Sequence, residues 1–286
     1  MHKLIKELNE RAAKKIAEAD AALANVQVQM FLPGMEDWVR AMPNHLARSS
    51  LFAPVARGRK KMHNEAVLVS RADCNLTYTG EQLDEAQADV ALQLIFDAKQ
   101  SPLGTPVTFH RRTFLKSIGR ASSGPNYEWL QRTMKAFAKA TLIIEAKKPD
   151  GAMRYHVGST ETFHILGFKY NEDTEEYSYI LDSRWKTLFG NREYALIDWD
   201  KRLQIGRNQD MAKTLQRLIA TSSNLIQRYN LEWLKDKMQY MSPMRKFKES
   251  LLSSVDELKR LEVIVHGQID LNAKGAEQLT LTIAQI

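Results

Sequence analysis

The strongest constraint on the fold is a pattern that occurs twice: a short helix, a turn, a long amphipathic helix and then β-forming segments. The first long helix is expected over residues 125–140, where apolar residues recur at helical spacing from Tyr127 to Phe137. The second is expected from Ser242 to Leu261. Because single cores tend to stop growing near ~250 residues, two copies explain a chain of 286 residues better than one large core.

Each long helix is expected to turn a basic face away from its apolar stripe. At about 100° per residue, Arg132, Lys135 and Lys139 lie opposite the stripe of the first helix, and Arg245 and Lys246 lie opposite that of the second. A helix about 10 Å wide fits the DNA major groove, and a following hairpin can reach neighbouring phosphates. The sequence therefore predicts an α+β protein with two tandem winged-helix domains (helix-turn-helix plus β-hairpin wing).

The wing of the first domain is expected directly after the long helix. Residues 141–146 and 153–157 are rich in β-forming residues, and Lys147 and Lys148 lie in the turn between them. Strands at 163–170 and 177–181, joined by an acidic turn, are expected to connect the two halves.

The predicted organisation has three parts. Residues 1–34 form an N-terminal helical or flexible arm, 35–170 the first winged-helix domain, and 171–286 the second. Within the first domain, Thr79 and Gln82 have the spacing of a capping box for a helix that runs through Ala98.

The charge balance favours an anionic partner. Lys and Arg number 41 against 34 Asp and Glu, which leaves a net charge of +7, and Arg111 to Lys148 holds nine basic residues against two acidic ones. The alternative for each position is a solvated helix face. Lys248 lies at the flank of the apolar stripe, and its alternative role is to cover the core with its aliphatic stem. Glu249 could accept a hydrogen bond from a cytosine amino group, or it could hold the side chain of Arg245 in place. The candidate DNA-binding residues are Arg111, Arg112, Lys116, Arg132, Lys135, Lys139, Lys147, Lys148, Ser242, Arg245, Lys246, Lys248 and Glu249.

The sequence lacks the usual signatures of an enzyme. It has no phosphate-binding loop of the form G-x-x-x-x-G-K-[ST], and its seven histidines show no metal-ligand spacing. Adjacent acids such as Asp84 and Glu85 are expected on solvated helix faces. No catalytic residue, metal or cofactor is predicted.

The cellular location is inferred from the cysteine content and from the lack of a long apolar segment. The single cysteine, Cys74, excludes a disulfide scaffold and suits a reducing cytoplasm. No apolar run approaches the ~18 residues of a membrane span, so a cytoplasmic protein without membrane contact is expected.

Four segments support a resemblance to a known family, over roughly residues 27–264. They are RAMPNHLARSSLF (40–52), TYTGEQLDEAQADV (77–90), SPLGTPVTF (101–109) and RKFKE (245–249). These segments resemble the TrfA family of plasmid replication initiators. The resemblance implies two winged-helix domains that bind directly repeated origin sequences (iterons) and help to open an adjacent AT-rich stretch, with contact to its single strands. It also implies recruitment of the host replicative helicase together with the host initiator ATPase, a role in plasmid copy control, and a homodimer as a storage form.

The family also carries a clamp-binding peptide of the form Gln-Leu-Ser/Asp-Leu-Phe before its first domain. Gln27, Val28, Gln29, Met30 and Phe31 occupy that place here. Gln27 and Phe31 match, Val28 and Met30 are apolar replacements, and Gln29 departs from the pattern. The resemblance implies binding to the DNA polymerase sliding clamp. The alternative is that Met30 and Phe31 pack on the first domain.

Taken together, the sequence predicts a non-catalytic plasmid replication initiator. A winged-helix transcriptional repressor would have the same DNA-binding body without origin opening, and a nicking enzyme would need metal or nucleotide motifs that are not present in the sequence.

Overall fold

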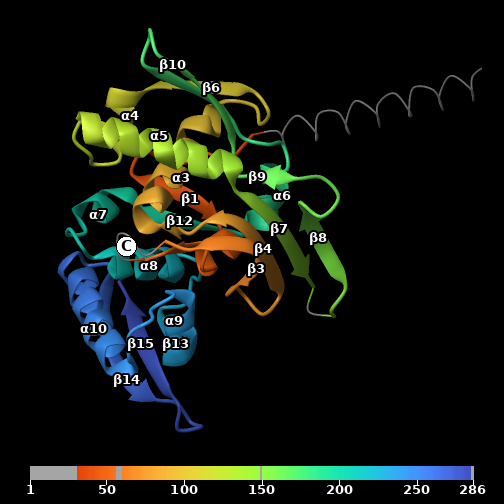
Figure 1. The fold of residues 1–286 in the computed structure, drawn as a ribbon. Helices are drawn as coiled ribbons and strands as arrows, with labels where there is room; N and C mark the ends of the chain where they lie inside the picture. Colours follow the sequence, from red (N-terminus) through yellow and green to blue (C-terminus); the bar gives the residue numbers. More distant parts are fainter. Residues whose placement is uncertain (1–30, 56–59, 149, 285–286) are drawn as a thin grey trace, which may run out of the picture.

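The computed structural model describes residues 31–55, 60–148 and 150–284. Helices and strands are mixed along the whole of this part, in agreement with the predicted α+β class (Figure 1). The helices are α2 (Asn44–Arg48), α3 (Glu85–Asp97), α4 (Arg111–Ser117), α5 (Gly124–Lys139), α6 (Trp185–Leu188), α7 (Trp199–Gln204), α8 (Asp210–Ile219), α9 (Leu231–Lys237) and α10 (Met244–Arg260), with 3-10 turns at Ala98–Gln100 and Gly190–Arg192. The strands are β1 (Val39–Pro43), β2 (Phe52–Ala53), β3 (Met62–Leu68), β4 (Cys74–Glu81), β5 (Leu83–Asp84), β6 (Pro106–His110), β7 (Thr141–Lys147), β8 (Met153–Val157), β9 (Phe163–His164), β10 (Gly167–Asn171), β11 (Glu176–Ile180), β12 (Tyr194–Asp198), β13 (Ile226–Asn230), β14 (Ile264–Leu271) and β15 (Glu277–Ile283).

Residues 85–180, here called the first unit, contain α3, β6, α4, α5, β10 and β11 in that order, with β7, β8 and β9 inserted between α5 and β10. Strands β10, β11 and β6 form an antiparallel three-stranded sheet in the order β10-β11-β6. Aromatic stacking ties this sheet to the helices: the ring of Phe109 on β6 stacks on Tyr177 of β11 at 5.2 Å and on Phe114 of α4 at 4.2 Å between centroids. The sheet and the helix pair therefore share one core.

Residues 210–283, here called the second unit, repeat the order with α8, β13, α9, α10, β14 and β15. Their sheet has the order β13-β15-β14. In both units the strand before the short helix pairs with the last strand of the hairpin. The two units lie at opposite ends of the molecule, with α5 and the β10–β11 hairpin at one end and α10 and the β14–β15 hairpin at the other (Figure 1).

The hairpin that the sequence assigned as the first wing has a different place. Strands β7 and β8 form the expected antiparallel pair, but β7 also pairs with β4 and β9, so the hairpin belongs to a five-stranded sheet with β3 and β4. Strands β10 and β11, which were expected to connect the two halves, form instead the hairpin of the first unit. This difference arises because the 141–164 segment finds its partner in β4, about 65 residues earlier in the chain, by pairing that no local pattern reveals.

The long helices bury the stripes that the sequence predicted. Helix α5 buries Leu130, Met134 and Phe137, and α10 buries a stripe that begins at Phe247 and ends at Leu258. The start of α3 was predicted wrongly. Residues 74–81 continue as strand β4, and the capping box is formed by Asp84 and Gln87, in which each side chain accepts from the other residue's backbone N–H.

The buried apolar side chains form two separate clusters. One runs along the chain from Leu32 to Trp199 and the other from Ile205 to Leu281. Strand β1 pairs with β12, so the beginning of the described chain is tied to the segment just before the second unit. The expected domain boundary at residue 170 falls inside the paired β10 and β11 strands. In the described residues no helix is both long and apolar enough to cross a lipid bilayer.

Candidate nucleic-acid interface

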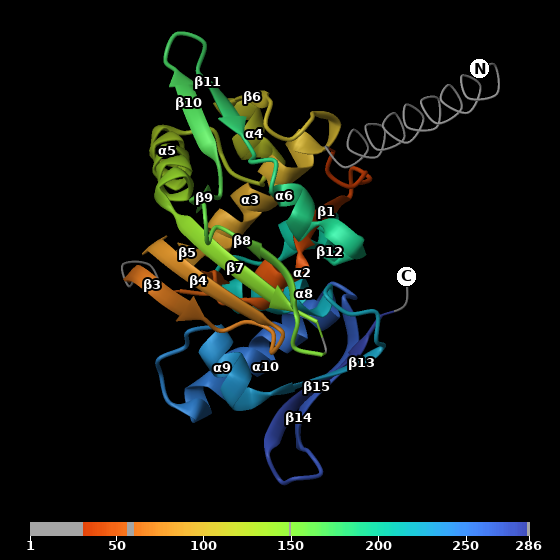
Figure 2. The ribbon, with the colours of Figure 1, turned by 90° about the vertical axis from the view of Figure 1, so that its right-hand side faces the viewer.

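Helix α5 presents three of the predicted basic residues to solvent. Arg132, Lys135 and Lys139 are all exposed, while the opposite side of the helix is buried. Arg132 lies 3.7 Å from Glu128, one turn earlier. Lys135 and Lys139 have no ion-pair partner within the described residues. The helix lies on the outside of the first unit in both views (Figures 1 and 2), so this basic face is open to a partner.

Helix α10 has the corresponding position in the second unit. Arg245 and Lys246 are exposed in its first turn, directly before the buried Phe247. The guanidinium of Arg245 lies 3.8 Å from Glu249, and their side chains are 86% and 66% exposed. Such an exposed pair is weak, so Arg245 can exchange Glu249 for another acceptor. Ser242 is half-buried in the turn before the helix.

Two of the predicted basic residues are already engaged by the hairpins. Lys248 forms an ion pair with Glu277 on β15, which links α10 to the second hairpin. Arg111 at the start of α4 forms an ion pair with Glu175, in the turn of the first hairpin, and its guanidinium lies 4.0 Å from the centre of the Tyr127 ring. Both side chains are thus partly engaged within the protein.

The other four predicted positions are surface residues near the first unit. Arg112 and Lys116 are exposed on α4, and Lys147 and Lys148 are exposed at the end of β7. The first two lie on α4, the shorter helix of the pair that α4 and α5 form. The second two lie on the five-stranded sheet instead of on the hairpin that pairs with β6.

The tips of the two unit hairpins carry opposite charge. Between β10 and β11 the chain contains Glu172, Asp173 and Glu175, of which the first two are exposed. Between β14 and β15 the only charged residue is the exposed Lys274. The first hairpin thus repels a phosphate backbone, whereas the second one attracts it.

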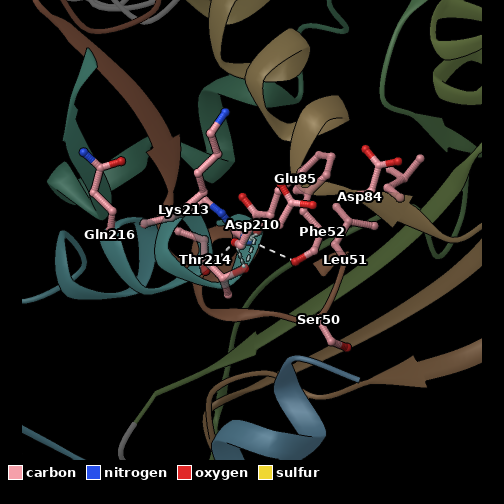
Figure 3. A network of polar contacts seen from close by, with 12 residues as sticks. Ser50, Leu51, Phe52, Asp84, Glu85, Asp210, Lys213, Thr214 and Gln216 are labelled. Carbon is pink, nitrogen blue, oxygen red and sulfur yellow. Dashed lines mark hydrogen bonds and ion pairs between the residues drawn. The ribbon is translucent and has the colours of Figure 1, made fainter. Parts of the chain in front are cut away.

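Between the two units lies a group of buried charges that the sequence did not predict (Figure 3). Arg202 donates to Glu85 at 2.9 Å and to Asp89 at 2.6 Å, and Thr214 donates to Glu85 at 2.8 Å. Lys213 pairs with Asp89, and Arg217 pairs with Glu85. We call these six residues the inter-unit network: Glu85, Asp89, Arg202, Lys213, Thr214 and Arg217.

The network favours the ionised forms of Glu85 and Arg202. The side chains of Glu85, Arg202 and Arg217 are 0% exposed. Burial alone would raise the pKa of Glu85, but the guanidinium groups of Arg217 and Arg202 outweigh it and lower that pKa to about 2. Burial would lower the pKa of Arg202, and the carboxylates of Asp89 and Glu85 raise it instead.

The expectation that Glu85 lies on a solvated helix face is therefore wrong. Glu85 is the first residue of α3, and α8 covers that end of α3. Helix α8 is itself buried on nearly all sides. A single sequence gives little warning of this, since a buried ion pair uses the same residue types as a surface one. The one available signal is that α8 contains Arg217 between Leu215 and Leu218, within its most apolar turn.

Other predicted sites fall outside these surfaces. Gln27, Val28, Gln29 and Met30 lie outside the described residues, and Phe31, the last residue of the proposed clamp-binding peptide, is 45% exposed. Within the described part of the chain, no group of three or more His, Cys, Asp or Glu side chains is arranged to hold a metal ion.

Comparison with known proteins adds a sequence match and a fold match. A family model described as TrfA protein matches residues 3–268. The plasmid replication initiator protein TrfA of Escherichia coli is 22% identical over 282 residues, which cover 93% of this chain and 71% of that protein. The crystal structure of domains 2 and 3 of RctB has a TM-score of 0.55 at 11% identity and covers 86% of this chain and 99% of that one. At this identity the likeness to RctB concerns the fold alone.

Proposed function

The chain belongs to the TrfA protein family, and from this premise we propose that it is a plasmid replication initiator that binds the iterons of its origin. A curated relative with this activity in its name matches 93% of the chain. In this proposal the protein acts by binding DNA and host proteins and carries no catalytic activity of its own.

The observation that carries the DNA-binding part of the proposal is the shared position of α5 and α10. Each is the long helix of a unit with the same element order and the same strand pairing, and each turns exposed basic residues away from its buried stripe. We propose that both units are winged-helix domains and that α5 and α10 enter successive major grooves. The division between the domains would then lie between residues 199 and 205, where the apolar cores separate.

The exposed basic residues have distinct proposed roles. Lys135, Lys139, Arg112 and Lys116 would neutralise phosphates beside α5, and Lys246 would do so beside α10. Arg245 is proposed to read a base, because a guanidinium can donate two parallel hydrogen bonds to guanine and Glu249 holds it only loosely. The pairing of Arg111 and Lys248 with hairpin carboxylates supports a role for them in orienting the hairpins.

Further steps of initiation are proposed from the family. They are opening of an adjacent AT-rich stretch, recruitment of the host helicase with the host initiator ATPase, binding of the sliding clamp by residues 27–31, and a homodimeric storage form. All of these steps would take place in the cytoplasm.

Permanganate footprinting on a supercoiled plasmid tests the proposal. The plasmid carries the DNA that flanks the gene, which we expect to contain direct repeats of roughly 20 bp, about two helical turns, beside an AT-rich block. Opened thymines next to the protected repeats are expected. Protection without opening would indicate a repressor, and a covalent nick would indicate an enzyme; either outcome would overturn the proposal.

A further inference from the structure

The seam between the two units is polar where a protein core is usually apolar. The two clusters of buried apolar side chains do not merge across it. The inter-unit network occupies the seam, with Glu85 and Asp89 on α3 of the first unit, Arg202 on α7, and Lys213, Thr214 and Arg217 on α8 of the second. Figure 3 labels Glu85, Lys213 and Thr214 of this group. Directional hydrogen bonds and ion pairs therefore cross the seam between the units.

Further hydrogen bonds extend this seam to the segment around β2. Arg217 donates to the carbonyl of Ala47 at 2.8 Å and to that of Phe52 at 2.9 Å, in addition to its pair with Glu85. From α9 of the second unit, the fully buried Lys237 donates to the carbonyl of Ser49 at 2.9 Å. One guanidinium thus contacts three separate segments. The second buried basic side chain, Lys237, contacts the neighbouring loop, and burial lowers its pKa well below the ordinary value of 10.5.

Directional contacts of this kind constrain orientation more than they add stability. Replacing a buried ion pair with apolar residues is often neutral or stabilising, whereas leaving one partner unpaired is strongly unfavourable. The guanidinium fork accepts only a narrow range of acceptor positions. A rotation or sliding of the second unit would leave several buried charges without partners at once, so only one relative placement satisfies them all.

We propose that the inter-unit network is a positioning device that sets the distance and the rotation between α5 and α10, and thereby the length of DNA repeat that the protein accepts. This inference rests on the proposed function for its consequence, but the rigidity itself is a property of the protein alone. Each base pair inserted between the two bound halves moves one half along the helix axis and turns it by roughly 35°, since B-DNA has 10–10.5 bp per turn. A protein with a fixed seam cannot follow that turn.

The first experiment measures rigidity without DNA. Spin labels are placed at Glu128→Cys on α5 and Asp256→Cys on α10, two exposed positions, in the full 286-residue chain. Cys74 is buried, and burial raises the pKa of its thiol to about 11, so it should stay unlabelled at neutral pH. Double electron–electron resonance is then recorded for the parent and for Glu85→Gln/Arg217→Met, which removes one charge of each sign.

A single narrow distance distribution is expected for the parent and a broadened or shifted one for the double variant. The matched control is Arg40→Met, because Arg40 is also a buried arginine but donates to Gln93 within the first core. The control should keep the narrow distribution even if it lowers the melting temperature. A folded double variant with the parent's narrow distribution would overturn the proposal.

The second experiment measures repeat length. Duplexes carrying one repeat from the DNA that flanks the gene are made with zero to five base pairs inserted at the centre. One inserted pair should weaken parent binding by about tenfold or more, on the order of the effect of one mismatched base pair, and should weaken the double variant by less than about threefold. Equal losses for both proteins would overturn the proposal. If the parent binds no duplex, the proposed function fails, while the resonance experiment still decides whether the network fixes the seam.

Discussion

The exposed faces of α5 and α10 and the inter-unit network use the same charged residue types in opposite surroundings. On the helix faces, Arg245 and Glu249 are mostly exposed and 3.8 Å apart. In the network, Glu85 and Arg202 are fully buried and 2.9 Å apart. An exposed pair gains little because water solvates both charges well, whereas a buried pair cannot lose one partner without a large penalty.

This difference separates two roles for charge in one molecule. Exposed arginine and lysine remain available to a partner and can change acceptor at little cost. Buried ones already bind acceptors within the protein and hold neighbouring elements together. Charge on the faces should therefore control binding, and charge in the seam should control stability and geometry.

The largest expected effect is the loss of a network carboxylate. Glu85→Ala removes the carboxylate that pairs with Arg217 and with one donor of Arg202, and should lower the free energy of unfolding by about 3–5 kcal/mol. Glu128→Ala, which removes an exposed partner of Arg132, should change it by less than about 0.5 kcal/mol. Urea denaturation followed by circular dichroism measures both. Similar values for the two variants would remove the distinction between the regions.

Salt should affect the two regions differently: it should weaken DNA binding by the helix faces and leave the stability of the network nearly unchanged. If about six phosphates are neutralised by the basic faces, DNA affinity should fall on the order of 10³-fold between 50 and 200 mM salt. The urea midpoint of the free protein should move little over that range, because buried pairs are screened much less than exposed ones. Filter-binding and denaturation titrations in the same buffers test this. A flat binding response would contradict the role given to the helix faces.

Much of the architecture could be predicted from the sequence because it depends on the local spacing of apolar residues. The stripe from Leu130 to Phe137 on α5 and the stripe of α10 both follow helical spacing, and the structure buries both. The order of the short helix, the long helix and the hairpin in the second unit was also predicted, since the hairpin directly follows α10. Strand β13, which pairs with β15, was not predicted.

One error is local, at the start of α3, and the others concern contacts between distant parts of the chain. The first unit contains an inserted segment, β7 to β9, that resembles a wing locally, and only its pairing with β4 shows that it belongs to another sheet. The capping residue of α3 was misplaced because Thr79, like Asp84, has a suitable residue three positions later. The burial of Glu85 depends on Arg202 and Arg217, more than 110 residues away. Periodicity carries no information about such partners.

Acid should lower the free energy of unfolding more in the parent than in a variant that lacks the Glu85–Arg217 pair. The pKa of Glu85 is about 2 in the fold, below its ordinary value of 4.5, because Arg217 and Arg202 outweigh the effect of burial. Its contribution is complete above about pH 4.5 and is lost as the pH falls toward 2. Between pH 7 and pH 2 the parent should lose about 3 kcal/mol more stability than Glu85→Gln/Arg217→Met. Urea midpoints across this range give the comparison, and parallel curves would show that Glu85 is not held by the two arginines.

The smallest expected effect distinguishes residues within the exposed faces. Arg245→Ala should weaken binding to the repeat by about 1–3 kcal/mol and reduce discrimination against a changed base by a similar amount, provided that Arg245 reads a guanine. Lys139→Ala should weaken binding to all duplexes alike, because a lysine near a phosphate carries no base information. Both variants should unfold at the parent's urea concentration, since both side chains are exposed. Competition titrations with the repeat and with a single-base variant measure the discrimination. If Arg245→Ala keeps the parent's selectivity, Arg245 contacts the backbone as Lys139 does, and base reading on α10 must lie with other side chains.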